Sequence, residues 1–184
     1  YKSLGDIEQA ARTAVDRLVY GQSALATGQF NESAQAFQDA SGLISQAKSD
    51  LHGALASSQK IAEWIDVTGT VRTGSNLLEA VEELARAGQR VSAGLEPLLS
   101  DEPLTGSIEK AKAQFGMAAT HLGEVDKNLA GVRVDVIPDE LQDDFHSLQV
   151  LVPRAHDLLN QFSSQADALL YVLGSNQDRQ YLVL

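Results

Sequence analysis

The sequence contains no cysteine and has one tryptophan and one methionine among its 184 residues. The absence of cysteine excludes disulfides, zinc sites built on thiolates and cysteine nucleophiles. No apolar run approaches the ~18 residues that a membrane-spanning helix needs. The fourteen glycines form neither a dinucleotide-binding fingerprint nor a phosphate-binding loop, and no nucleophile elbow occurs. Several common classes of enzyme are therefore excluded.

Basic residues are also scarce, because 14 Lys and Arg stand against 25 Asp and Glu, for a net charge of -11. Nucleic-acid affinity depends on clustered basic side chains, so we expect no nucleic-acid partner. Apolar residues make up 43% of the chain, which is close to the globular norm and predicts a buried core rather than wholesale disorder. The chain begins at Tyr1 and ends at Leu184, and we expect both ends to have been cut from something longer.

The histidines offer no paired site. No two of them are three or four residues apart, so no helix face presents two imidazoles to a metal; they are His52, His121, His146 and His156. No Ser–His–acid set can be brought together from the sequence either. We therefore predict no catalytic residue, no cofactor and no metal site, and we predict that the protein is not an enzyme.

Three further sets of residues could form a metal or acid–base site, but each has a simpler interpretation. Asp143 and His146 could supply two ligands or an acid–base pair, but a solvated helix face is favoured. His156 and Asp157 are adjacent and should point apart on a helix. The acidic segment 138–144 lacks the alternating ligands and central glycine of a calcium loop, and instead predicts a helix start.

Other polar positions also have a structural interpretation. Glu82 and Glu83 are predicted to lie on an exposed helix face. The threonines and glycines of 68–74 could present backbone N–H groups to an anion, although a loop with a helix cap is favoured. Asn31 begins a glycosylation acceptor string but is explained as a helix N-cap, and Trp64 as a core or bundle-end residue.

Apolar and small residues recur at steps of three and four from Leu4 to Leu25, and again from Phe37 to Ile65. The pattern predicts a helical hairpin over 2–65, whose second helix, 31–65, would be about 52 Å long at ~1.5 Å per residue. Small residues alternate with large ones along that helix, which lets two helix axes approach closely; these are Ala40, Ala47 and Ala54.

Further helices are predicted over 76–99, 107–132 and 138–173, after an irregular connection over the β-branched and glycine-rich residues 66–75. Pro153 predicts a kink or a short break in the last helix, and Gly174 is placed to end it. The predicted fold class is all-α, an elongated antiparallel bundle of about five long helices with coiled-coil spacing, forming one domain over 1–174.

Residues 175–184 are predicted to be a turn and the start of a truncated following domain. The turn-forming residues 175–178 follow the helix end, and the last residues are apolar and β-prone. We expect a strand fragment over 180–184.

The segment 168–174 (ALLYVLG), with 178–184 (DRQYLVL), resembles a junction in a bacterial family known as domain of unknown function 4012. In that family a leucine-rich helix ends in Leu-Gly, and a short polar turn leads into the first strand of the next domain. Two further segments, 27–30 (TGQF) and 137–141 (IPDEL), and the helix over 77–88 are similar to its amino-terminal region. The resemblance implies an envelope protein whose membrane anchor and mixed α/β domain lie outside this chain, and it brings no catalytic residues.

These observations predict a non-catalytic extracytoplasmic helical module, a spacer or protein-interaction platform of a bacterial cell-envelope protein at the cell surface. Its expected partners are other envelope proteins or cell-surface polysaccharide, with membrane attachment only through an anchor absent from this chain. The alternative is a ligand-binding sensory bundle, which would need an apolar pocket between helices with convergent polar groups.

The small residues of the second helix can be tested directly. Replacing Ala47 with Leu should overpack the interface between two helices and lower the free energy of unfolding by roughly 1–3 kcal/mol. Urea denaturation of both proteins measures the difference. A neutral or stabilising Ala47→Leu would place this alanine on a loose or solvent-facing seam.

Overall fold

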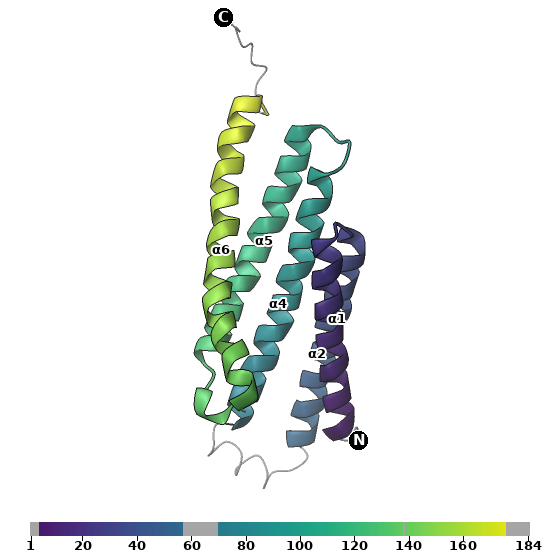
Figure 1. Cartoon of the computed structure of the whole chain (residues 1–184), viewed down its shortest axis with the longest axis vertical. Coiled ribbons are helices and arrows are strands. Elements are labelled where there is room, and N and C mark those ends of the chain that lie inside the picture. The colour runs from purple at the N-terminus through teal and green to yellow at the C-terminus, as the bar shows by residue number, and fades with distance from the viewer. Residues whose placement is uncertain (1–3, 57–69, 138, 176–184) are drawn as a thin grey trace, which may run out of the picture.

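The computed structural model describes residues 4–56, 70–137 and 139–175 (Figure 1). Nearly all of these residues are helical, and no strand occurs among them; the elements are α1 (Leu4–Ala26), α2 (Phe30–Ala56), α4 (Thr70–Leu98), α5 (Leu104–Ala130), the short 3-10 helix η1 (Val134–Val136) and α6 (Asp139–Leu173). The predicted all-α bundle of five long helices is confirmed. The strand fragment predicted over 180–184 lies outside the described residues.

Helix α4 lies in the middle of the bundle. It packs against α2 on one side and α5 on the other, while α1 packs on α2 and α6 packs on α5. Successive helices alternate in direction along the long axis, so α1, α4 and α6 run the same way (Figure 1). Helix α1 touches α4 at few points. The two outer helices, α1 and α6, therefore leave part of α4 uncovered between them.

The main hydrophobic core joins α4, α5 and α6. It is made of aliphatic side chains and one phenylalanine, including Ala80, Ala87, Leu122, Val125, Leu129, Phe145 and Val152. A second, smaller cluster of Ile108, Ala166 and Leu170 lies further along α5 and α6. Burying such side chains is the main force that holds α6 to the bundle.

The turn between α1 and α2 is closed by backbone hydrogen bonds. Gly28 has φ +78°, a left-handed conformation that glycine adopts without strain. Its N–H donates to the Leu25 carbonyl (3.2 Å), and the Gln29 N–H donates to the Ala24 carbonyl (2.8 Å). This is the Schellman pattern of a helix end. This turn joins the two helices of the predicted hairpin.

Helix α2 begins at Phe30, one residue before the N-cap predicted at Asn31. That prediction is wrong because the Ser33 N–H already donates to the carbonyl of Gln29 (2.9 Å), which closes the first helical turn ahead of Asn31. Further along α2, Ala40 and Ala47 are fully buried, as their spacing predicted. The part of the predicted 31–65 helix beyond α2, with Trp64, lies outside the described residues.

The irregular connection predicted over 66–75 is wrong for residues 70–75, which form the first turns of α4. Thr73 is buried, and its hydroxyl accepts a hydrogen bond from the Arg133 N–H (3.3 Å). The Asn76 side chain donates to the Gly131 carbonyl (2.9 Å). These contacts with the chain that follows α5 favour the helix over the weak helical propensity of its β-branched and glycine residues.

Two proline positions explain the remaining differences at helix ends. Helix α5 begins at Leu104 rather than 107, because Pro103 takes the extended N-cap conformation (ψ 131°) and its carbonyl accepts from the Ser107 N–H (3.0 Å). Of the kink or short break predicted at Pro153, the break does not occur, since α6 continues through it. Val152 is buried beside Pro153, and this packing offsets the hydrogen bond that proline cannot donate. At the far end, Gly174 has φ +78° and ends α6, as predicted.

A pair of buried serines links α2 to α4. Ser33 and Ser92 are fully buried, and their hydroxyl oxygens lie 2.9 Å apart. The Ser33 hydroxyl also donates to the Gly21 carbonyl of α1 (2.8 Å), and the Ser92 hydroxyl to the Gly88 carbonyl (2.9 Å). Three helices are thus joined at one point.

Phenylalanine rings fill the space left by glycines on α4. A Cβ atom built on Gly94 would lie 2.7 Å from Cδ1 of Phe115 and closer still to its Cε1. The same ring makes an edge contact with Phe162 of α6, with centroids 4.8 Å apart and planes at 78°. Gly94 therefore permits the close approach of α4 and α5 and holds the ring that α6 packs against.

Replacing Gly94 with Ala should lower the free energy of unfolding by roughly 1–3 kcal/mol, because the Phe115 ring must move. Gly42 is the matched control, since a Cβ there meets no atom within 4 Å on the exposed face of α2. Gly42→Ala should instead stabilise by about 0.5–1 kcal/mol through helix propensity. Urea denaturation measures both, and equal effects would contradict the proposed close approach.

Candidate binding groove

An open groove of about 480 Å³ lies between α1 and α6, over α4. Its walls and floor come from all five helices; they comprise Val15, Leu18, Val19, Gln22 and Leu25 of α1, Phe37 of α2, Leu84, Ala87, Gly88 and Val91 of α4, Leu122 of α5, and Ala155, Leu158 and Leu159 of α6. The groove is the place where α4 is left uncovered by its neighbours.

The Phe37 ring forms part of the floor. A Cβ atom built on Gly88 of α4 would lie 2.9 Å from this ring, and one on Gly21 of α1 would lie 3.1 Å from it. The ring is therefore held between two glycines on different helices. This packing draws α1, α2 and α4 together at one end of the groove and fixes the depth of its floor.

The walls expose large apolar side chains to solvent. Val15 and Val19 of α1 are 53% and 61% exposed, and Leu158 of α6 is 65% exposed. Single exposed apolar residues are ordinary, but here they face one groove whose floor is also apolar. Covering them would remove apolar surface from water, so the groove is suited to binding.

The chemistry of the groove is almost wholly apolar. Among the described residues that line it, Gln22 alone has a polar side chain, and no charged group is present. Such a site can hold an apolar surface, but it offers neither a nucleophile nor a general base.

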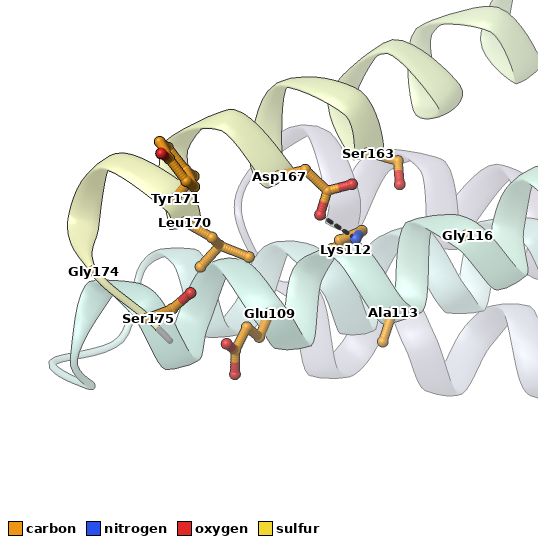
Figure 2. A pocket seen from close by; sticks show the side chains of 10 residues that line it. All are labelled: Glu109, Lys112, Ala113, Gly116, Ser163, Asp167, Leu170, Tyr171, Gly174 and Ser175. Carbon is orange, nitrogen blue, oxygen red and sulfur yellow. Dashed lines mark hydrogen bonds and ion pairs between the residues drawn. The ribbon is translucent and has the colours of Figure 1, made fainter. Parts of the chain in front are cut away.

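A larger and more polar cavity, about 940 Å³, lies between α5 and α6 (Figure 2). Lys112 of α5 and Asp167 of α6 point toward each other there and form an ion pair. Ser163 also lines the cavity, but none of the four histidines does, so the serine has no imidazole base beside it. The two charges neutralise each other, and we assign this cavity no ligand.

A network of charged side chains joins α2 to α4. Glu82 is buried, with its side chain only 6% exposed, and it accepts a hydrogen bond from Lys48 Nζ of α2 (2.9 Å). Arg86, one turn along α4, donates to both Glu82 and Glu83. The prediction that Glu82 lies on an exposed face is wrong, because α4 is covered on two sides and this carboxylate is turned toward α2.

Glu83 extends the network to α5. Its second carboxylate oxygen lies 2.6 Å from Nδ1 of His121, and both side chains are mostly buried. The contact joins residues 38 positions apart, so only the fold brings them together. The network ties α2, α4 and α5 in a fixed register.

The other predicted candidates do not form sites. Asp143 and His146 are exposed, and His146 contacts Gln149 (3.3 Å), which agrees with a solvated face. Nδ1 of His156 lies 3.8 Å from Asp157, so these two do not point apart as predicted. His52 is exposed. In the described parts of the chain, no group of three His, Asp or Glu side chains could hold a metal ion.

The two segments for which an anion or a calcium site was the less favoured interpretation form the starts of helices where the structure describes them. Thr73 and Gly74 lie within α4, where the Thr73 hydroxyl is occupied by the Arg133 N–H; residues 68 and 69 lie outside the described residues. Asp139 starts α6, and the Gln142 side chain donates to its carboxylate (3.0 Å) and to the Ile137 carbonyl (3.2 Å). These contacts stabilise the start of a helix, as predicted.

Two exposed hydrogen-bonded pairs shift the pKa of one of their members. The Tyr20 hydroxyl donates to Glu32 (2.8 Å), and this hydrogen bond raises the pKa of Tyr20 while joining α1 to α2. Hydrogen bonding from Arg133 lowers the pKa of Asp135. Both pairs lie at the surface, away from the groove, so neither bears on what the groove binds.

No family model, no curated protein and no solved structure matches this chain. The resemblance to the family of unknown function 4012 stays a prediction from the motifs quoted above. None of the described helices combines the length and apolar character needed to cross a membrane.

The buried network predicts a clear difference between two carboxylates. Glu82→Gln should lower the free energy of unfolding by roughly 1–3 kcal/mol, because Lys48 and Arg86 lose a charged partner at a largely buried position. Glu124→Gln is the control, since Glu124 pairs with Lys127 at the surface, and we expect a change of at most about 0.5 kcal/mol. Thermal or urea denaturation of both variants measures the two changes in stability. Comparable losses of stability in the two variants would show that burial does not strengthen the network.

Proposed function

We propose that this chain is a non-catalytic protein-interaction module, the helical part of an extracytoplasmic bacterial envelope protein. The observation that carries the proposal is the apolar groove between α1 and α6, whose lining includes no charged side chain among the described residues. Its occupant would be a helix with an apolar face, packed between the two outer helices.

The shape of the groove favours a helix as its occupant. Its walls are α1 and α6, and α4 forms most of its floor. The two wall helices run in the same direction (Figure 1). Amphipathic helices bind in such grooves by inserting apolar side chains at steps of three and four residues. A helix running opposite to α1 and α6 would continue the alternation of directions already present in the bundle. A polysaccharide needs polar groups to bind its hydroxyls, and among the described residues of the groove lining only Gln22 has a polar side chain.

A sensory bundle that binds a small ligand is the second candidate. The volume of about 480 Å³ falls within the range of ordinary ligand sites, roughly 300–1,000 Å³. The convergent polar groups that would orient a polar ligand are missing from the described lining. A ligand of this groove would therefore be an apolar molecule.

The envelope location depends on the resemblance of the C-terminal segments, and the acidic, cysteine-free composition is compatible with it. In such a protein the bundle would act as a spacer that also carries a docking surface. The location and the interaction are separate parts of the proposal, and one experiment addresses both.

A photo-crosslinking amino acid placed at Val19, inside the groove, should capture a protein in cells that produce this chain. The same group at Ser45, exposed on α2, is the control and should not capture that protein. Leu158→Glu in the groove wall should abolish the capture at position 19. Envelope proteins among the captured partners would support the proposed location, and cytoplasmic ones would overturn it. Capture of a small apolar molecule alone would favour the sensory bundle.

A further inference from the structure

Helix α6 carries a second apolar stripe beside its buried face. Its members follow one another at alternating steps of four and three residues, the spacing of a coiled-coil seam; six are apolar, Leu151, Ala155, Leu158, Phe162, Leu169 and Val172, and one is polar, Gln165. Leu151, Leu169 and Val172 are 57%, 51% and 53% exposed, so they resemble Leu158 in exposure. Ala155 and Leu158 also line the groove. The stripe thus extends from the groove toward the C-terminal end of α6.

The same part of α6 has almost no charge. Residues 158–175 contain one charged side chain, Asp167, although 21% of the whole chain is charged. Asp167 pairs with Lys112 of the same chain (Figure 2). Surfaces that stay in water are normally rich in charge, whereas the centres of protein interfaces are depleted in it. This depletion is independent of the apolar spacing and indicates a covered surface.

The stripe is nearly symmetric about Phe162, so a second copy of the same stripe can pair with it. When a second copy of the stripe is laid antiparallel across that residue, Leu169 lies opposite Ala155, a large residue against a small one. Val172 then lies opposite Leu151, and Leu158 opposite Gln165. No pair of like charges meets along the seam.

We infer that the groove is filled by α6 of a second copy of this chain. The two α6 helices pair antiparallel about a two-fold axis near Phe162, and Leu169 and Val172 of each copy enter the groove of the other. There they would pack against Val15 and Val19 as well as α6. The contact is isologous, since each copy both supplies a helix end and receives one.

The size of the surface fits a dimer. The stripe spans about 32 Å of helix at ~1.5 Å per residue. With the groove walls it exposes on the order of 500 Å² of apolar surface, at the upper end of what typical monomers leave uncovered. A polar rim would bring this close to the roughly 800 Å² that each partner buries in a standard interface.

Sedimentation equilibrium of the 184-residue chain should show a species of twice 19.7 kDa that dissociates on dilution. Leu169→Glu should weaken the dimer about thirtyfold or more, since it places a charge where each helix end enters the apolar groove of the other copy. Leu99→Glu is the matched control, because Leu99 is exposed after α4 and lies outside both stripe and groove. Circular dichroism confirms that the variants fold. A monomer at every concentration, or equal weakening by both substitutions, overturns the inference.

The antiparallel arrangement has its own test, which the absence of cysteine makes simple. Gln161→Cys, beside the two-fold axis, should form disulfide-linked dimers under mild oxidation. Leu151→Cys should not, because its counterpart lies near the far end of the partner's stripe. Disulfide linkage at both positions would indicate parallel helices and would contradict the proposed antiparallel pairing.

The inference rests on the proposed function, because both assign the groove a helical occupant. Their failures can be told apart. A monomeric chain that captures a different protein at position 19 keeps the proposed function and refutes the dimer. If the crosslinking group at position 19 captures no protein while Gln161→Cys still forms a linked dimer, the groove is not the docking site.

Discussion

The fold depends on the close approach of two helices to α4 from different sides. On the side of α5, small residues repeat every seven positions at Ala80, Ala87 and Gly94. On the side of α2, Gly88 and Ser92 leave space for a phenylalanine ring and a buried hydroxyl. Small side chains let helix axes approach, and the rings of the neighbouring helices fill what remains. Every other helix is attached through α2 or α5.

The groove is a consequence of that order. Helix α4 is packed closely on two sides, which leaves one face uncovered. Helices α1 and α6 do not cover that face, because α1 packs mainly on α2 and α6 packs mainly on α5. The apolar residues that would have been buried by contact between α1 and α6 are instead exposed along its walls. An apolar face of this kind is costly in water, and a partner that covers it, as proposed above, would remove that cost.

Apolar spacing was sufficient to predict the helices, because each has one face buried and four of the five begin within about three residues of the expected position. It was insufficient for α4, which is buried on two sides and therefore carries two apolar patterns at once. Glu82 lies on one of these buried sides, so the spacing does not distinguish it from an exposed residue. Residues 70–75 were mispredicted because their helix depends on Thr73 and Asn76 contacting the chain after α5. The groove could not be predicted either, since its lining comes from five helices, and only the missing charge on α6 gave a local signal.

The two buried serines have fewer hydroxyl protons than hydrogen-bonding contacts. Ser33 and Ser92 together own two hydroxyl protons but make three short oxygen contacts: one with each other, one with Gly21 and one with Gly88. One contact must therefore lack a proton at any instant, and rotating the two hydroxyls exchanges which one it is without moving a heavy atom. Each serine can always be satisfied by a main-chain carbonyl, so the pair adds little to stability. It favours one axial offset of α2 against α4, because sliding either helix by a turn would separate the oxygens.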